Sequence, residues 1–202
     1  MYKIINQIRH KSTKHVSNQH KKHEKFLEQI ILSKGYKKSN LKDLNLTKKK
    51  IRNCEYGNHK TATMCYVSQP CGSQSFPDFL VIDKFGDIYY VEAKSSKDDK
   101  ITWNSGMPHE QAIYIFSSGE HDKQTAVMGS DLWTPEEKKL QLKIRDLIEQ
   151  TYKPQNKPEH SVQYYGRHMH NDNKKVYAHP ERKSRESKVY RYIGGRRSCH
   201  KC

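Results

Sequence analysis

The feature that most constrains the fold is a pair of short apolar runs separated by a turn. Phe79–Ile82 (FLVI) suits a buried strand, and Ile88–Val91 (IYYV) is rich in the β-branched and aromatic residues that favour strands. The residues between them, Asp83–Asp87, include Gly86 and two aspartates, which are typical of turns. The segment therefore predicts a β-hairpin near the middle of the chain.

Two helices are predicted, one before and one after the strands. The first runs from His20 to Lys34 and is followed by Gly35, a frequent helix stop. The second starts at Thr134 and Pro135, which suit the N-cap and the first helical position, and ends before Pro154. Their apolar faces comprise Phe26, Leu27, Ile30 and Ile31 in the first helix and Leu140, Ile144, Leu147 and Ile148 in the second.

Two more strands are predicted between the hairpin and the second helix. Ala112–Ser117 is an apolar run with aromatic and β-branched residues, and Thr125–Met128 is a shorter one. Because helices both precede and follow the strands, we expect an α/β protein.

The charge of the chain is high and unevenly distributed. Only 33% of the 202 residues are hydrophobic, and 38 Lys and Arg against 22 Asp and Glu give a formal charge of +16. Residues 1–50 and 153–202 are strongly basic, whereas residues 51–152 carry a small excess of acidic side chains. We therefore expect a polyanionic partner, nucleic acid first, with solubility alone as the other explanation of the charge. The pattern divides the chain into a basic N-terminal arm (1–19), a core (20–152) and a basic C-terminal region (153–202) rich in Tyr and Arg.

The chain lacks the signals of a membrane or secreted protein. No run approaches the roughly 20 apolar residues of a membrane span, and Met1–Lys11 lacks the apolar segment of a secretory signal. We expect a cytoplasmic protein without a membrane partner. Five cysteines, an odd number, disfavour a disulfide framework. The alternative is a structural zinc site that uses the C-terminal CxxC, although the spacings of the cysteines match no standard zinc motif: Cys54, Cys65, Cys71, Cys199 and Cys202.

Two carboxylates and a lysine flank the predicted hairpin. Asp78 lies directly before the first strand, and Glu92 and Lys94 end the second. Because side chains alternate along a strand, Glu92 and Lys94 point to one face, and the hairpin brings Asp78 beside Glu92. Two close carboxylates repel unless a cation lies between them, and oxygen ligands suit Mg²⁺. This is the set of groups needed to hydrolyse a phosphodiester.

The pattern Pro77-Asp78, a 13-residue spacer, then Glu92-Ala93-Lys94 resembles the PD-(D/E)xK nuclease superfamily, which includes type II restriction endonucleases. The resemblance covers roughly residues 20–130. It implies a restriction-endonuclease-like core, a mixed central β-sheet flanked by helices. That family often has a further glutamate on the helix before the sheet, and Glu24 matches that position, with Glu28, which lies further round from the apolar face, as the alternative.

The resemblance also implies roles for these residues. Asp78 and Glu92 would hold Mg²⁺, for which Mn²⁺ can substitute, with the Ala93 carbonyl as a further ligand. Lys94 would orient the attacking water, and Glu24 would complete the site. Sequence analysis further suggests a contact to the phosphates of double-stranded DNA by Lys97. Asn104, His109 and Gln111 are candidate contacts to bases or phosphates, for which ordinary loop polarity is the alternative. In the C-terminal region the candidate DNA contacts are Arg182, Arg185, Arg191, Arg196 and Arg197.

The preferred interpretation is a type II restriction endonuclease acting as a homodimer, since cutting both strands with one site per chain requires two copies. A structure-selective nuclease, such as a Holliday-junction resolvase or a repair nuclease, is the alternative with the same chemistry. A non-catalytic basic nucleic-acid-binding protein is the alternative from another class.

Overall fold

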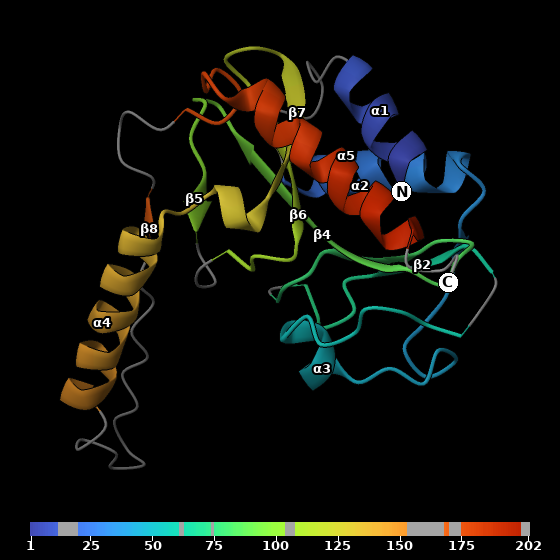
Figure 1. Ribbon diagram of the computed structural model, residues 1–202, viewed down its shortest axis with the longest axis horizontal. Coiled ribbons are helices and arrows are strands. Elements are labelled where there is room, and N and C mark those ends of the chain that lie inside the picture. Colours follow the sequence, from blue (N-terminus) through green and yellow to red (C-terminus); the bar gives the residue numbers. More distant parts are fainter. Residues whose placement is uncertain are drawn as a thin grey trace.

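The computed structural model describes residues 1–11, 20–60, 63–73, 75–103, 108–152, 168–169 and 175–198. It is an α/β protein built on a six-stranded mixed sheet with strand order β1-β2-β3-β4-β6-β7, flanked by helices (Figure 1). The strands of this sheet are β1 (Lys37–Lys38), β2 (Cys65–Ser68), β3 (Phe79–Ile82), β4 (Ile88–Ser96), β6 (Ile113–Ser118) and β7 (Lys123–Met128). The helices are α1 (Tyr2–His10), α2 (His20–Ser33), α3 (Lys48–Arg52), α4 (Pro135–Tyr152) and α5 (Arg182–Ser198), with a 3₁₀ turn at Gly129–Asp131. A separate antiparallel pair joins β5 (Thr102–Trp103) and β8 (His168–Met169).

The predicted hairpin is confirmed and lies at the centre of the sheet. β3 and β4 pair antiparallel, with Phe79 opposite Val91 and Ile82 opposite Ile88. In the turn, the Asp83 carboxylate accepts the backbone N–H of Phe85 at 2.9 Å. Gly86 has a φ of 84°, and a Cβ there would lie 2.1 Å from the His59 carbonyl oxygen, so a side chain cannot fit. The turn residues therefore fix the register of the two strands.

The two later strands are confirmed as well. β6 runs parallel to β4, from Val91 opposite Ile113 to Ser96 opposite Ser118, and β7 returns antiparallel beside β6. β4 continues five residues beyond the predicted Val91, because it pairs with β6 past Phe79, where β3 begins. β4 is therefore the strand that connects the hairpin to the rest of the sheet.

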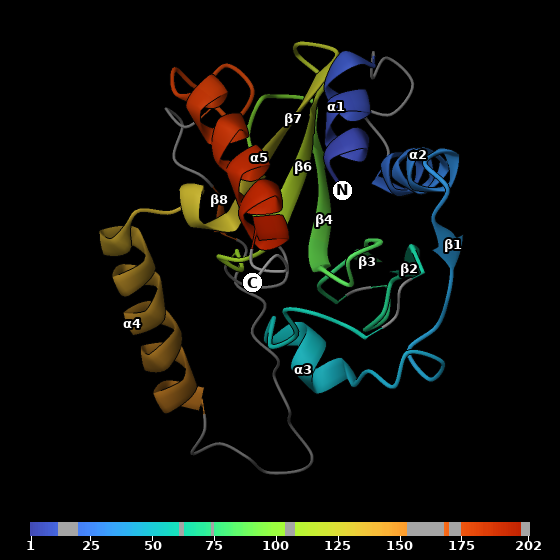
Figure 2. The ribbon, with the colours of Figure 1, turned by 45° about the vertical axis from the view of Figure 1, so that its right-hand side comes forward.

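Helices α1, α2 and α5 cover one face of the sheet (Figure 2). The predicted helix at His20–Lys34 is confirmed as α2, and Gly35 follows it with a φ of 84°. The sequence predicts a basic arm or a weak helix at residues 1–19, and the structure has helix α1 in its first half, with Ile4, Ile5 and Ile8 buried against the sheet. Residues 12–19 lie outside the described residues.

The C-terminal region also contributes to the core. Residues 153–202 have few aliphatic side chains, so the sequence by itself predicts that their order depends on a bound partner. In the structure α5 packs along β7, and Val189 and Ile193 are fully buried. Two well-placed aliphatic residues are sufficient because the sheet supplies the remaining apolar surface.

The opposite face of the sheet carries a second core and α3. Leu44, Leu46 and Ile51 pack there with Tyr90 and Tyr114. Glu92 and Lys94 alternate with the buried Val91 and Ala93, so they lie on this face with Tyr90. α3 and the predicted catalytic residues therefore share one side of the sheet.

Helix α4 is confirmed but projects away from the sheet in both views (Figures 1 and 2). Thr134 caps it as predicted, with reciprocal hydrogen bonds between Thr134 and Glu137. Its apolar stripe is not buried, since Leu140, Ile144 and Leu147 are 56%, 38% and 65% exposed. Across the described residues, we find no helix with the length and apolarity needed to cross a bilayer.

Candidate active site

The register of the hairpin brings the two predicted carboxylates together. Asp78 precedes Phe79, which pairs with Val91, so Asp78 lies opposite Glu92. The Asp78 backbone N–H donates to Glu92 Oε2 at 3.1 Å, and the Ala93 N–H donates to Asp78 Oδ2 at 2.7 Å. Each carboxylate thus continues the ladder of the hairpin by one step beyond its backbone hydrogen bonds.

Lys94 completes the cluster. Its Nζ donates to Glu92 Oε1 at 2.9 Å, and the two side chains are only 13% and 8% exposed. The same Nζ lies 5.7 Å from the centre of the Trp103 ring, which shields the lysine from one side. A cation held in this way is a fixed positive charge next to the carboxylates.

The electrostatics of Asp78 are unusual for an aspartate. Burial, followed by the charge of Glu92, raises the pKa of Asp78 to about 7, even though the Ala93 N–H and Lys94 act in the opposite direction. Two carboxylates in a desolvated position hold both negative charges only with difficulty unless a cation joins them.

Glu24 lies beside this cluster rather than within it. It comes from α2, and its Oε2 accepts a hydrogen bond from Gln69 Nε2 at 2.9 Å. Its charge contributes to the raised pKa of Asp78, so the two carboxylates are close enough to interact. Nowhere among the described residues, however, do three His, Cys, Asp or Glu side chains converge to hold a metal ion. The expectation that Glu24 completes the metal site therefore has only its proximity in its favour.

The remaining groups suit a hard cation. Asp78 Oδ1 has no hydrogen-bond partner within the described part of the chain. The Ala93 N–H points to Asp78, and because the N–H and C=O of a strand residue face the same neighbour, the Ala93 carbonyl faces Asp78 too. Two carboxylates and a carbonyl, with water in the other positions, are the ligands that Mg²⁺ accepts.

Two neighbours of the cluster carry no signal in the sequence. Gln69 connects Glu24 to the loop before β3, because its N–H donates to the Asp78 carbonyl oxygen at 2.6 Å. Phe76 stacks on His109 with ring centres 3.9 Å apart. Burial lowers the pKa of His109, whereas the charge of Glu92 opposes this change. Loop residues such as these become neighbours of the cluster only through the fold, so their spacing in the sequence does not predict the contact.

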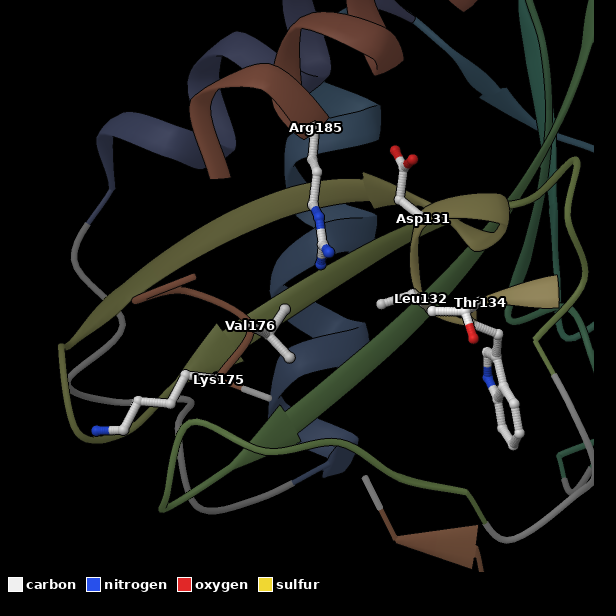
Figure 3. A pocket seen from close by; sticks show the side chains of 7 residues that line it. Asp131, Leu132, Thr134, Lys175, Val176 and Arg185 are labelled. Carbon is white, nitrogen blue, oxygen red and sulfur yellow. The ribbon is translucent and has the colours of Figure 1, made fainter. Parts of the chain in front are cut away.

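Most of the predicted DNA contacts in the C-terminal region are occupied by internal interactions. Arg182 pairs with Glu186 at 3.2 Å and lies over the Tyr177 ring, and Arg196 donates to the carbonyl oxygens of Gly57 and Ile88 at 2.8 and 2.7 Å. Arg185 points into a small cavity of about 70 Å³ (Figure 3). That cavity is lined by Asp131, Leu132, Trp133, Thr134, Lys175, Val176 and Arg185, and it includes no residue of the carboxylate cluster.

Arg191 and Lys97 are exposed, in agreement with a role in binding. Asn104 and the side chain of Arg197 lie outside the described residues. Of the described candidates, Lys97, Gln111 and Arg191 are exposed, whereas Arg182, Arg185 and Arg196 make internal contacts.

No disulfide joins the three cysteines in the described part of the chain. Cys54, Cys65 and Cys71 are buried and free, and burial raises the pKa of each thiol, that of Cys54 to about 12. Protonated thiols are poor zinc ligands. Within the described residues, these three cysteines form no group that could hold a metal ion. Cys199 and Cys202, which the zinc alternative requires, lie outside the described residues.

Comparison with known proteins finds no matching family model, no matching curated protein and no matching solved structure.

Proposed function

We propose that this protein is a Mg²⁺-dependent DNA endonuclease of the PD-(D/E)xK type with a restriction-endonuclease-like core. The observation that carries the proposal is the meeting of Asp78, Glu92 and Lys94 at the point where β3 begins and β4 extends past it. The basic charge of the chain supports a phosphate-rich substrate.

The residues of the cluster would have different roles in catalysis. Asp78, Glu92 and the Ala93 carbonyl would hold the ion, and Lys94 orients the attacking water and offsets the charge that develops on the phosphate. When bound, Mg²⁺ supplies Lewis-acid activation of the phosphate and of a water molecule. Gln69 and Glu24 fix the loop that carries Asp78, since Gln69 binds both Glu24 and the Asp78 carbonyl.

We favour a type II restriction enzyme that acts as a homodimer. One site per chain cuts one strand, so a cut through a duplex requires a second copy. Helix α4 presents Leu140, Ile144 and Leu147 to solvent at a spacing of one helical face, and an exposed apolar stripe of this kind is typical of an interface. A second copy of the chain is the occupant that the two-strand reaction calls for.

The direct test is incubation with supercoiled plasmid and Mg²⁺, Mn²⁺ or Ca²⁺, followed by gel electrophoresis. We expect discrete cuts with Mg²⁺ and Mn²⁺, binding without cutting in Ca²⁺, and loss of cleavage in Asp78→Asn and Glu92→Gln. Asp98→Asn is the matched control, because Asp98 is an exposed carboxylate beyond the end of β4.

The substrate separates the alternatives. Fragments with fixed ends favour a restriction enzyme, whereas cleavage confined to a synthetic four-way junction favours a structure-selective nuclease. Tight binding without cleavage in any metal would leave a non-catalytic nucleic-acid-binding protein, and full cleavage by both carboxylate variants would exclude this site as the catalytic centre.

A further inference from the structure

Helix α3 concentrates exposed positive charge that the protein does not neutralise. Its sequence is KKKIR, and Ile51 is fully buried and anchors the helix in the second core. Lys48, Lys49 and Arg52 fall within about a third of the helix circumference at 100° per residue, and all three are exposed. Lys50 points elsewhere, because its Nζ lies over the Tyr56 ring at 5.7 Å.

Several cations elsewhere in the described residues have carboxylate partners. Lys38 pairs with Glu28 at 2.9 Å, and Lys175 with Glu120 at 2.8 Å. Similar pairs in the described residues are Lys138 with Glu110, Lys188 with Asp131, and Arg9 and Arg182 with Glu186. Within the same described part of the chain, none of Lys48, Lys49 and Arg52 forms an ion pair with a carboxylate. Their charges are therefore available to a ligand.

The helix is attached to the candidate active site from two directions. Cys71 Sγ lies 3.6 Å from the Lys48 carbonyl oxygen, and Cys71 belongs to the loop that leads to Asp78. On the other side, Thr47 at the start of α3 donates its N–H to the Tyr56 hydroxyl at 3.1 Å.

Tyr56 connects that contact to β4. The Tyr56 N–H donates to the Tyr90 hydroxyl, and the Tyr90 hydroxyl donates to the Tyr56 carbonyl oxygen, each at 2.9 Å. Tyr90 lies on the same face of β4 as Glu92, one alternation away. Because both connections are short, α3 has a fixed position relative to the carboxylates.

We infer that Lys48, Lys49 and Arg52 form a docking surface for the phosphate backbone of duplex DNA, which holds the duplex on the side of the sheet that carries Asp78, Glu92 and Lys94. The inference rests on the proposed function, since it names the surface by which that site receives its substrate. It also moves the main DNA contact from the C-terminal region to α3. Phosphate contacts of this kind position the duplex and carry no sequence preference of their own.

The test measures the affinity of the full chain for a short fluorescein-labelled duplex by anisotropy, in EDTA, over a range of KCl concentrations. We expect the triple variant Lys48→Ala, Lys49→Ala, Arg52→Ala to flatten the slope of log K against log salt by roughly 3 and to lower affinity about 10²-fold at about 0.15 M salt. The variant Lys48→Arg, Lys49→Arg keeps the charge and should retain the wild-type slope. Circular dichroism checks that each variant is folded.

Two matched controls locate the effect. Lys50→Ala removes a lysine from the same helix but from its Tyr56 side, and it should change the slope by much less than one unit. The triple variant Lys3→Ala, Lys123→Ala, Lys183→Ala removes three exposed lysines from α1, β7 and α5, away from α3. It should bind like the wild type.

The outcomes separate this inference from the proposed function, because binding in EDTA requires no cleavage. Loss of affinity in the α3 variant alone supports the docking surface, even if the plasmid assay shows no nuclease. A wild-type slope in a folded α3 variant overturns the inference, even if the plasmid is cut. Equal losses in the α3 variant and in the Lys3, Lys123 and Lys183 variant overturn it as well, since binding would then follow overall charge.

Discussion

The replacement Asp78→Asn should stabilise the metal-free protein at alkaline pH. Asp78 carries a pKa of about 7 in the folded chain against 3.8 for an ordinary aspartate, because burial and the charge of Glu92 disfavour its ionised form. An asparagine keeps the shape and can still accept the Ala93 N–H through its Oδ1, but it cannot ionise.

The sign follows from proton binding. As the pH rises from about 4 to about 7, the unfolded chain loses the Asp78 proton while the folded chain retains it, so the free energy of unfolding falls across that window. Below the window the wild type and the variant are alike, and above it the wild type is destabilised by an amount on the order of a few kcal/mol. In a chain of this size, each kcal/mol corresponds to about 2–4 °C in melting temperature.

Urea unfolding at about pH 5 and about pH 8 in EDTA measures the effect as the difference between variant and wild type, which cancels the other titrating groups. Asp98→Asn is the control with the opposite expectation, since a hydrogen bond from Ser96 lowers the pKa of Asp98. Mg²⁺ at about 100 times its dissociation constant should stabilise the wild type by about 2.7 kcal/mol and the Asp78 variant by much less. If Asp78→Asn lowers the free energy of unfolding equally at both pH values, the raised pKa of Asp78 does not destabilise the folded protein and this reasoning is wrong.

Three further predictions concern other parts of the molecule. Lys94→Ala should lower the cleavage rate about 10²–10⁴-fold. Lys94→Arg should restore little of that rate, because a guanidinium does not fit the position of a compact ammonium group. If the arginine variant cleaves at the wild-type rate, Lys94 contributes only its positive charge. Arg196→Ala should lower the free energy of unfolding in urea by about 1–3 kcal/mol, since the Gly57 and Ile88 carbonyls lose a charged donor. DNA affinity should be unchanged. A loss of affinity without a loss of stability would show that Arg196 contacts DNA. Leu147→Lys should convert a dimer to a monomer in light scattering, and an unchanged dimer would place the interface away from α4.

The central hairpin and the carboxylate cluster could be predicted because their determinants are local. A turn with Gly86 between two apolar runs fixes the register of β3 and β4, and the register alone puts Asp78 opposite Glu92. Nothing beyond the alternation of side chains along a strand is then needed to bring Lys94 to the same face. The contribution of Gln69 could not be predicted, because it depends on where a loop meets α2.

Both basic ends of the chain bury a few aliphatic residues, and the physical reason is the same at each end. A helix needs only a few aliphatic residues when a large sheet supplies the other half of the interface, and Ile4, Ile5 and Ile8 in α1 and Val189 and Ile193 in α5 meet that need. Composition averaged over a segment conceals such residues among many charges. Helix α4 is the opposite case, because it has a clear apolar stripe that is nevertheless exposed. Such a stripe predicts a helix but does not specify what covers it.

Net charge therefore identifies the class of partner more readily than the surface that binds it. In α5 the acidic Glu186 is almost fully buried with Arg9 and Arg182 beside it, so those cations stabilise the junction of α1 and α5 rather than awaiting a phosphate. On the five-residue helix α3, Lys48, Lys49 and Arg52 form no ion pair with a carboxylate among the residues that the structure describes. A polyanion gains most where the protein has left its cations unpaired, because no internal ion pair must be broken first. The pairing of the basic residues, which only the fold reveals, is what directs the DNA to the α3 side of the sheet in our proposal.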